Sequence, residues 1–190
     1  VLFRSDKADS VKIARYALDK WQSLEPYSIT DELRAQLKVM NRQFHFYVKQ
    51  KTAMKNNLIG LIDQTYPNAN TYFNSPTRSD GSQKWVDFVS TYWHVDCIRK
   101  MSLNAFVEHY QNWCKRKKYA FNKSKAEEIY TKTKELVPVF PKNEITKHII
   151  RQAIDQLNST SVTVETIRTL MNETASKLPE YSIVMQFKGI

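Results

Sequence analysis

Two acidic side chains near the start of the chain, Asp6 and Asp9, are three residues apart. On a helix this spacing places both carboxylates on one face within a single turn. Paired carboxylates are ligands that Mg²⁺ prefers, and two-metal sites align an attacking oxygen for phosphodiester cleavage. The same pattern also arises where one aspartate caps a helix and the other complements its dipole. The pair therefore predicts either a metal site or an ordinary helix start.

Six basic side chains gather between residues 115 and 125, interleaved with aromatic ones. Cations neutralise phosphates, and aromatic rings stack on unpaired bases. The competing interpretation is a helix that ends in cations because they favour its C-terminal dipole. The basic residues are Lys115, Arg116, Lys117, Lys118, Lys123 and Lys125, and the aromatic ones are Trp113, Tyr119 and Phe121.

A set of histidines and cysteines, His94, Cys97, His109 and Cys114, has the residue types of a tetrahedral zinc site. Its spacing matches no common ligand pattern, and His109 and Cys114 are five residues apart, which separates them on a helix. Free buried cysteines and partly buried histidines account for the set better than zinc does.

The net charge of the 190-residue chain is 29 − 19 = +10, which favours polyanionic partners, nucleic acid before an anionic membrane surface. Only 3 glycines are present, which excludes Gly-rich phosphate loops and dinucleotide-binding motifs. No apolar run reaches the roughly 18 residues that a membrane-spanning helix needs. The 2 cysteines favour a reducing cytoplasm.

The elements that must position these residues are predicted to be helices. Residues 6–21 form the first, capped by Ser5 or Asp6 and ended before Pro26. A second begins at Thr30 or Asp31 and runs to about residue 66. Its heptad stripe is Leu33, Leu37, Met40, Phe44, Tyr47, Lys51, Met54, Leu58 and Leu61.

A matching stripe lies between residues 142 and 178, where the polar stretch 158–161 predicts a kink or a break. Its members are Ile150, Ala153, Leu157, Thr160, Val164, Ile167, Met171, Thr174 and Leu178. Two rods of equal length and period indicate an antiparallel coiled-coil arm, and two ordinary amphipathic helices in a bundle are the alternative. Cations along the first rod could line a nucleic-acid track or form a solvated outer face. They are Arg34, Lys38, Arg42, Lys49, Lys51 and Lys55.

Between the rods, residues 67–82 read as a loop, and an aromatic-rich helical insert follows. Trp85, Phe88, Val89 and Tyr92 share one helix face. A second helix, capped by Ser102, presents Phe106, Tyr110 and Trp113, and a third begins near Ser124. The predicted fold is all-α: a long antiparallel coiled-coil helical arm with a small aromatic insert at its tip.

Three blocks of the chain resemble the insertion sequence 110 family of DNA transposases. Residues 6–18 are similar to the Thr-Asp-x-x-Asp-Ala helix that ends the family's RuvC-like nuclease domain, with Ser5 in place of Thr and Ser10 in place of Ala. Residues 51–67 are similar to a block on its long helix, and residues 178–190 to the run into its C-terminal transposase domain.

The resemblance implies that Asp6 and Asp9 are the last two members of a four-carboxylate site for Mg²⁺, and that the first two precede Val1. It places the family's serine nucleophile after Ile190. It also implies DNA and a structured guide RNA as partners, homo-oligomers formed through the coiled coil, no membrane, and a bacterial cytoplasmic location. A fragment with half of the carboxylates is not expected to cut DNA.

We accordingly expect an internal fragment of a transposase. Residues 1–5 can be encoded by GTG CTC TTC CGA TCT, which matches the end of a sequencing adapter, so we interpret them as an assembly artefact. The predicted divisions are the artefact at 1–5, the last RuvC-like helix at 6–25, the first coiled-coil helix at 26–67, the insert at 68–141, the second coiled-coil helix at 142–179 and the start of the C-terminal domain at 180–190.

Two other functions fit the sequence. One is a non-enzymatic basic coiled-coil adaptor that binds RNA or DNA. The other is a plain interaction module whose basic surface serves solubility alone. Salt-dependent binding to structured RNA would separate the transposase and the adaptor from the interaction module.

Overall fold

The computed structural model describes residues 6–23 and 32–186, with backbone alone for residues 6–8. Every regular element in these ranges is helical, which confirms the all-α prediction. The predicted caps Ser5, Thr30 and Asp31 lie outside the described residues. The elements are α1 (Asp6–Lys20), η1 (Trp21–Ser23), α2 (Glu32–Asp63), η2 (Ala69–Tyr72), α3 (Lys84–Thr91), α4 (Asp96–Arg99), α5 (Leu103–Arg116), α6 (Lys123–Glu135), α7 (Glu144–Ala175) and α8 (Tyr181–Val184).

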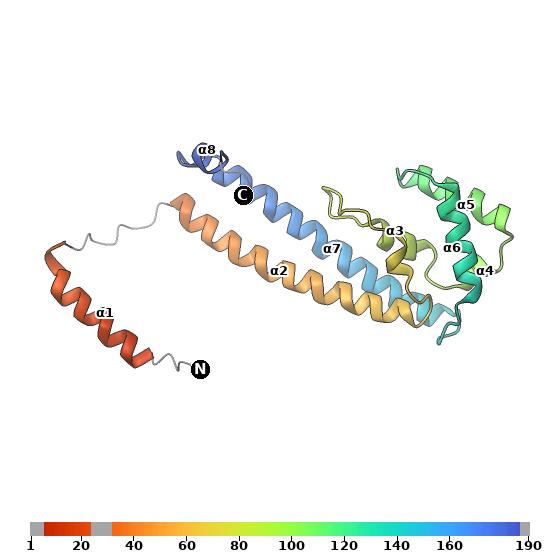
Figure 1. Cartoon of the computed structure of the whole chain (residues 1–190), viewed down its shortest axis with the longest axis horizontal. Coiled ribbons are helices and arrows are strands. Elements are labelled where there is room, and N and C mark those ends of the chain that lie inside the picture. Colours follow the sequence, from red (N-terminus) through yellow and green to blue (C-terminus); the bar gives the residue numbers. More distant parts are fainter. Residues whose placement is uncertain (1–5, 24–31, 187–190) are drawn as a thin grey trace.

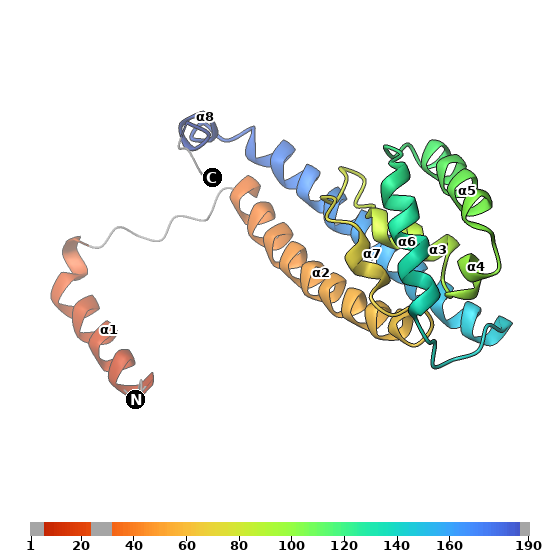
Figure 2. The same cartoon turned by 45° about the vertical axis from the view of Figure 1, so that its right-hand side comes forward.

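The long helices α2 and α7 lie side by side and run in opposite directions (Figure 1). Their contacts follow the chain in reverse order, as antiparallel pairing requires. Near the start of α2, the Arg34 guanidinium donates at 2.7 Å to Oε1 of Glu180, the residue just before α8. Further along, the Thr160 hydroxyl contacts the Met54 sulfur at 3.1 Å. Figure 2 shows the same pairing from a second direction.

The stripes predicted for both rods face the pair. Each predicted position on α2 and α7 is buried or half-buried. Most of the remaining α2 positions before Leu58 are exposed. The apolar period in the sequence therefore identified the packed face of both helices.

The break predicted at residues 158–161 does not occur, because α7 continues from Glu144 to Ala175. The Thr160 hydroxyl donates to the Gln156 carbonyl at 3.0 Å, one turn earlier, so it stays within the helix. Small Ser161 is buried where Gly81 of the loop before α3 meets it. Small Ser161 thus allows the loop at Gly81 to lie close against the helix.

The insert packs around aromatic rings, as predicted. Phe88 of α3 and Trp113 of α5 are buried, with ring centroids 5.9 Å apart. The Ser102 hydroxyl caps α5 by accepting from the Ala105 N–H at 3.3 Å. Helix α6 begins at Lys123, a residue before the predicted start, because the Asn122 side chain caps it.

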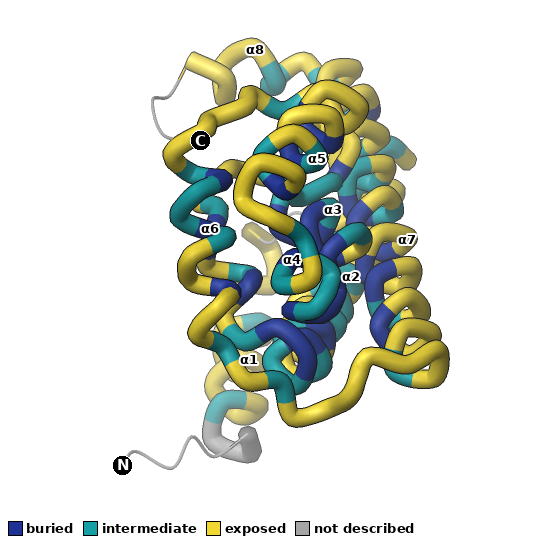
Figure 3. Tube along the Cα trace, turned by 90° about the vertical axis from the view of Figure 1, so that its right-hand side faces the viewer, coloured by how far each residue is buried: buried dark blue, intermediate teal, exposed yellow. Residues whose placement is uncertain are grey.

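The insert core is continuous with the end of the helix pair. Leu58 and Ile62 of α2, and Ile150 and Ile154 of α7, belong to the same buried cluster as the aromatic rings. Figure 3, viewed from that end, shows the buried stretches of α2, α3 and α7 facing a shared interior. The insert therefore braces the tip of the pair.

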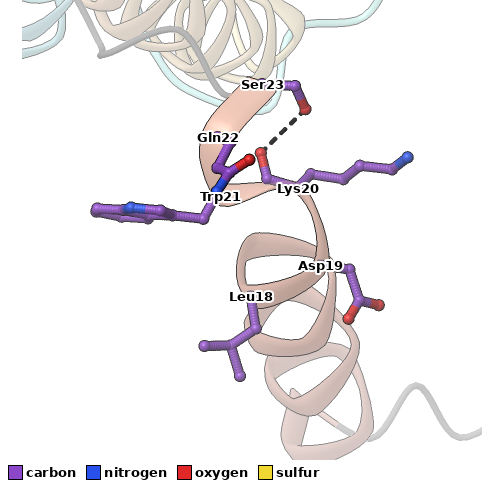
Figure 4. Close-up of a pocket in the computed structure, with 6 residues that line it drawn as sticks. All are labelled: Leu18, Asp19, Lys20, Trp21, Gln22 and Ser23. Carbon is purple, nitrogen blue, oxygen red and sulfur yellow. Dashed lines mark hydrogen bonds between the residues drawn. The ribbon is translucent and has the colours of Figure 1, made fainter.

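Helix α1 lies apart from the helix pair in both views (Figures 1 and 2). Its last turn passes into η1, where the Ser23 hydroxyl donates to the Lys20 carbonyl at 3.0 Å (Figure 4). Leu18 and Trp21 project to one side there, and they are 80% and 76% exposed. The end of α1 thus presents apolar side chains to solvent.

Candidate functional site

The predicted metal-binding pair lies on α1. Asp6 is the first residue of the helix, and Asp9 follows one turn later with a half-buried side chain. The side chain of Asp6 lies outside the described residues. Oxygen donors one turn apart suit Mg²⁺. Within the described part of the chain no three His, Cys, Asp or Glu side chains are grouped to hold a metal ion.

The six predicted basic residues flank the connection between α5 and α6. Lys115 and Arg116 end α5, Lys117 and Lys118 form the turn, and Lys123 and Lys125 open α6. Lys118 adopts a left-handed conformation with φ 55°, and the next N–H, of Tyr119, donates to the Cys114 carbonyl at 2.8 Å. The left-handed residue Lys118 thus ends the helical turn, a role that glycine usually fills.

Arg78, in the loop before α3, caps the end of α5. Its guanidinium Nη2 donates to the carbonyls of Lys117 at 3.0 Å and Lys118 at 2.9 Å. The guanidinium also lies 3.9 Å from the centroid of the Tyr119 ring. A cation on the last carbonyls of a helix satisfies acceptors that have no partner in the helix and favours its dipole. The positive charge of Arg78 therefore has a structural role.

Asp87 of α3 neutralises Lys117, one of the six basic residues. Its Oδ1 accepts from Lys117 Nζ at 2.7 Å, and its Oδ2 accepts from the Tyr119 hydroxyl at 2.7 Å. Burial, together with the hydrogen bond to Asp87, raises the pKa of Tyr119. The hydroxyl therefore stays protonated and donates, so Lys117 and Tyr119 are joined to the core of the insert.

Acidic residues on α6 neutralise two more cations. Lys125 Nζ lies 3.0 Å from Glu128, and Lys123 Nζ lies 3.8 Å from Glu127. Hydrogen bonds from Lys132 and Lys125 lower the pKa of Glu128, which keeps that carboxylate charged. Lys115, Arg116 and Lys118 are exposed and form no ion pair within the described ranges.

The aromatic residues of this region do not offer the predicted stacking platform. Trp113 is buried at 1% exposure and stacks on Tyr119 with centroids 5.4 Å apart. The Arg78 guanidinium already covers the Tyr119 ring. Phe121 is 36% exposed and is the member of the predicted set that solvent reaches most. The prediction that Trp113 and Tyr119 stack on bases is wrong, because both rings are used to build the insert.

The histidines and cysteines do not form a metal site in the described part of the chain. His94 is buried, and its Nδ1 accepts from the Asp96 N–H at 3.0 Å. Its Nε2 therefore carries the proton and donates to the Phe140 carbonyl at 3.0 Å. Cys114 is buried, and burial raises the pKa of its thiol. Both residues are structural.

We call the six basic residues at 115–118, 123 and 125 the basic corner. Arg78 and Asp87 determine its charge, yet neither stood out in the sequence. Each is a single charged residue 30 or more positions from its partners. No periodicity connects such residues, because their contacts arise only when the loop and α3 fold against α5. A single Arg in a polar loop is the only trace that the sequence contains.

No helix in the described ranges combines the length and apolarity that a bilayer span requires. A protein-family model described as a transposase, for the DEDD transposases of insertion sequence 110, matches residues 4–67. The match includes α1 and α2 and both aspartates, and it covers about a third of the 190 residues. No curated protein and no solved structure matches the chain.

Proposed function

We propose that the chain is part of a DEDD transposase of the insertion sequence 110 family, whose model matches residues 4–67, and that it is the helical segment joining the two catalytic regions of such an enzyme. The parent moves DNA by phosphodiester chemistry. The observation that carries the proposal is the family match over the helix that holds both aspartates. The segment at 6–25 ends the RuvC-like region, and 180–190 leads into the serine-bearing one.

Asp6 and Asp9 are the proposed ligands of Mg²⁺, because their carboxylate oxygens suit this ion and their spacing places them on one turn of α1. Further acidic residues of the parent complete the set. When bound, the ion stabilises the charge that develops on the oxygens of a phosphodiester. The contribution of this chain is to hold the carboxylates in register through α1.

Strand transfer by the parent transposase tests this role. The variant Asp9→Asn keeps the shape of the side chain and removes its charge, so we expect transfer to fall by at least about 100-fold, as for loss of a key electrostatic group. Asp19→Asn is the matched control, because Asp19 is an exposed residue of the same helix and its substitution removes the same charge. Equal activity of both variants would refute the metal role, and an absence of strand transfer by the unmodified parent would favour the non-enzymatic nucleic-acid-binding adaptor.

The helix pair acts as an arm in this proposal. Helices α2 and α7 form a coiled coil that holds the catalytic regions at a set distance and brings two copies together. The antiparallel contacts and the half-buried stripes support this proposal. Analytical ultracentrifugation of the 190-residue chain tests the self-association, and a monomer at every concentration up to about 100 μM, a weak-affinity limit, would contradict it.

The insert contributes nucleic-acid binding through its basic corner. Lys115, Arg116 and Lys118 carry this role because they are exposed and form no ion pair in the described ranges. A structured guide RNA made by the element is the proposed ligand. Changing these three to Ser should weaken RNA binding and reduce its salt dependence, whereas an unchanged salt slope would remove the corner from the proposal.

A further inference from the structure

The charges of the two long helices are distributed unequally. Between Leu33 and Ile62, α2 contains six Lys or Arg residues and no Asp or Glu. Helix α7 contains Glu144, Asp155, Glu165 and Glu173 against three Lys or Arg residues. Lys51 faces the seam between the helices, where burial lowers its pKa and Glu165 raises it. Much of the surplus positive charge of the chain is thus concentrated on α2.

Three of these cations lie on one face of α2. Lys38, Arg42 and Lys49 are four and seven residues apart, which at about 100° per residue keeps them within roughly 40° of one another around the helix axis. All three are exposed, whereas the stripe that faces α7 is half-buried. The three side chains therefore point away from α7. We call them the outer basic face.

The outer basic face has no acidic partner among the residues that the structure describes. Lys38, Arg42 and Lys49 form no ion pair within the described residues, whereas Arg34 at the start of the helix is paired with Glu180. Like charges one turn apart on a helix repel each other. A polyanion lying along the helix reduces this repulsion.

We propose that the outer basic face binds the phosphate backbone of double-stranded DNA. This rests on the proposed function, in which DNA is the polyanion that the protein handles. Phe46, four residues after Arg42 and three before Lys49, lies about 40° from Arg42 around the helix axis and is 51% exposed. One ring beside three cations is too few to stack successive bases of a single strand, so we assign this face to phosphate contacts. From Lys38 to Lys49 the helix rises about 16 Å, a length over which one DNA strand presents about five phosphates.

Duplex binding by the 190-residue chain tests the proposal, with a random-sequence DNA duplex as the probe and KCl as the variable. The variant Lys38→Gln/Arg42→Gln/Lys49→Gln removes three phosphate contacts, so the slope of log K against log[KCl] should become shallower by about 2.7. The control Lys123→Gln/Lys132→Gln/Lys147→Gln removes the same net charge from lysines paired with Glu127, Glu128 and Glu144. We expect the control to retain most of the slope.

An equal loss of slope in the two triple variants would overturn the proposal, because overall charge would then account for binding. So would the absence of duplex binding by the unmodified chain, or a loss confined to a duplex RNA of the same sequence. A change in oligomeric state by sedimentation would identify the face as a protein interface. Strand transfer with Asp9→Asn is independent of these outcomes, so the two proposals can fail separately.

Discussion

The close approach of Gly81 to α7 allows a prediction with a built-in control. Gly81 has φ +83°, and a Cβ placed on it would lie 2.9 Å from both the carbonyl carbon and the oxygen of Ser161. Gly60, on the exposed side of α2, has no atom within 4 Å of such a Cβ. The same Gly→Ala change should therefore have opposite effects at the two positions.

For Gly81→Ala, the left-handed conformation costs about 1–2 kcal/mol and the overpacking about 1–3 kcal/mol, so the free energy of unfolding should fall by about 2–5 kcal/mol. For Gly60→Ala, better helix propensity should raise it by about 0.5–1 kcal/mol. In a domain of this size the first change lowers Tm by roughly 4–20 °C.

Thermal unfolding followed by circular dichroism measures both changes. Ser161→Ala should not rescue Gly81→Ala, because the nearest atoms are the backbone of Ser161. A Gly81→Ala variant as stable as the parent protein would show that the loop before α3 does not rest on α7. The reasoning about residues 158–161 would then be refuted.

Three further predictions concern buried or half-buried polar groups. Lys51→Met should raise the free energy of unfolding at neutral pH, because burial lowers the pKa of Lys51 and so its protonated form opposes folding. The difference in unfolding free energy between this variant and the wild type, measured by urea unfolding, should shrink as the pH rises toward 10.5. Tyr66→Phe removes the 2.5 Å hydrogen bond between the Tyr66 hydroxyl and Thr133 Oγ1, so chemical unfolding should show a loss of about 1 kcal/mol. Asp87→Asn leaves Lys117 without its ion-pair partner, so it should cost about 1–2 kcal/mol of stability while duplex binding, measured by fluorescence anisotropy, stays equal or tightens.

Local periodicity explains which parts of the fold the sequence could predict. The stripes from Leu33 to Leu61 and from Ile150 to Leu178 repeat at the helical period, and packing follows that period directly. The aromatic faces of α3 and α5 are short versions of the same signal. The cap at Ser102 is also local, because its partner Ala105 is three residues away.

Contacts between distant segments explain what the sequence could not predict. The stretch 158–161 looked like a helix break because its residues are polar, but Ser161 is small to admit the Gly81 loop, about eighty positions earlier. Likewise, the basic run at 115–118 looked free, although Asp87 neutralises Lys117 and Arg78 caps the carbonyls beneath it. Such contacts depend on the tertiary fold, which no short window of sequence contains.

Metal rescue of strand transfer tests most directly whether Asp9 is a metal ligand. Asp9→Cys in the parent transposase replaces a hard oxygen donor with a thiolate, which binds Mg²⁺ poorly and softer ions well. We predict that transfer is lost in Mg²⁺ and returns in Mn²⁺ or Cd²⁺, while Asp19→Cys transfers DNA in all three. Full activity of Asp9→Cys in Mg²⁺ would contradict the account, as would inactivity of the folded variant with every ion.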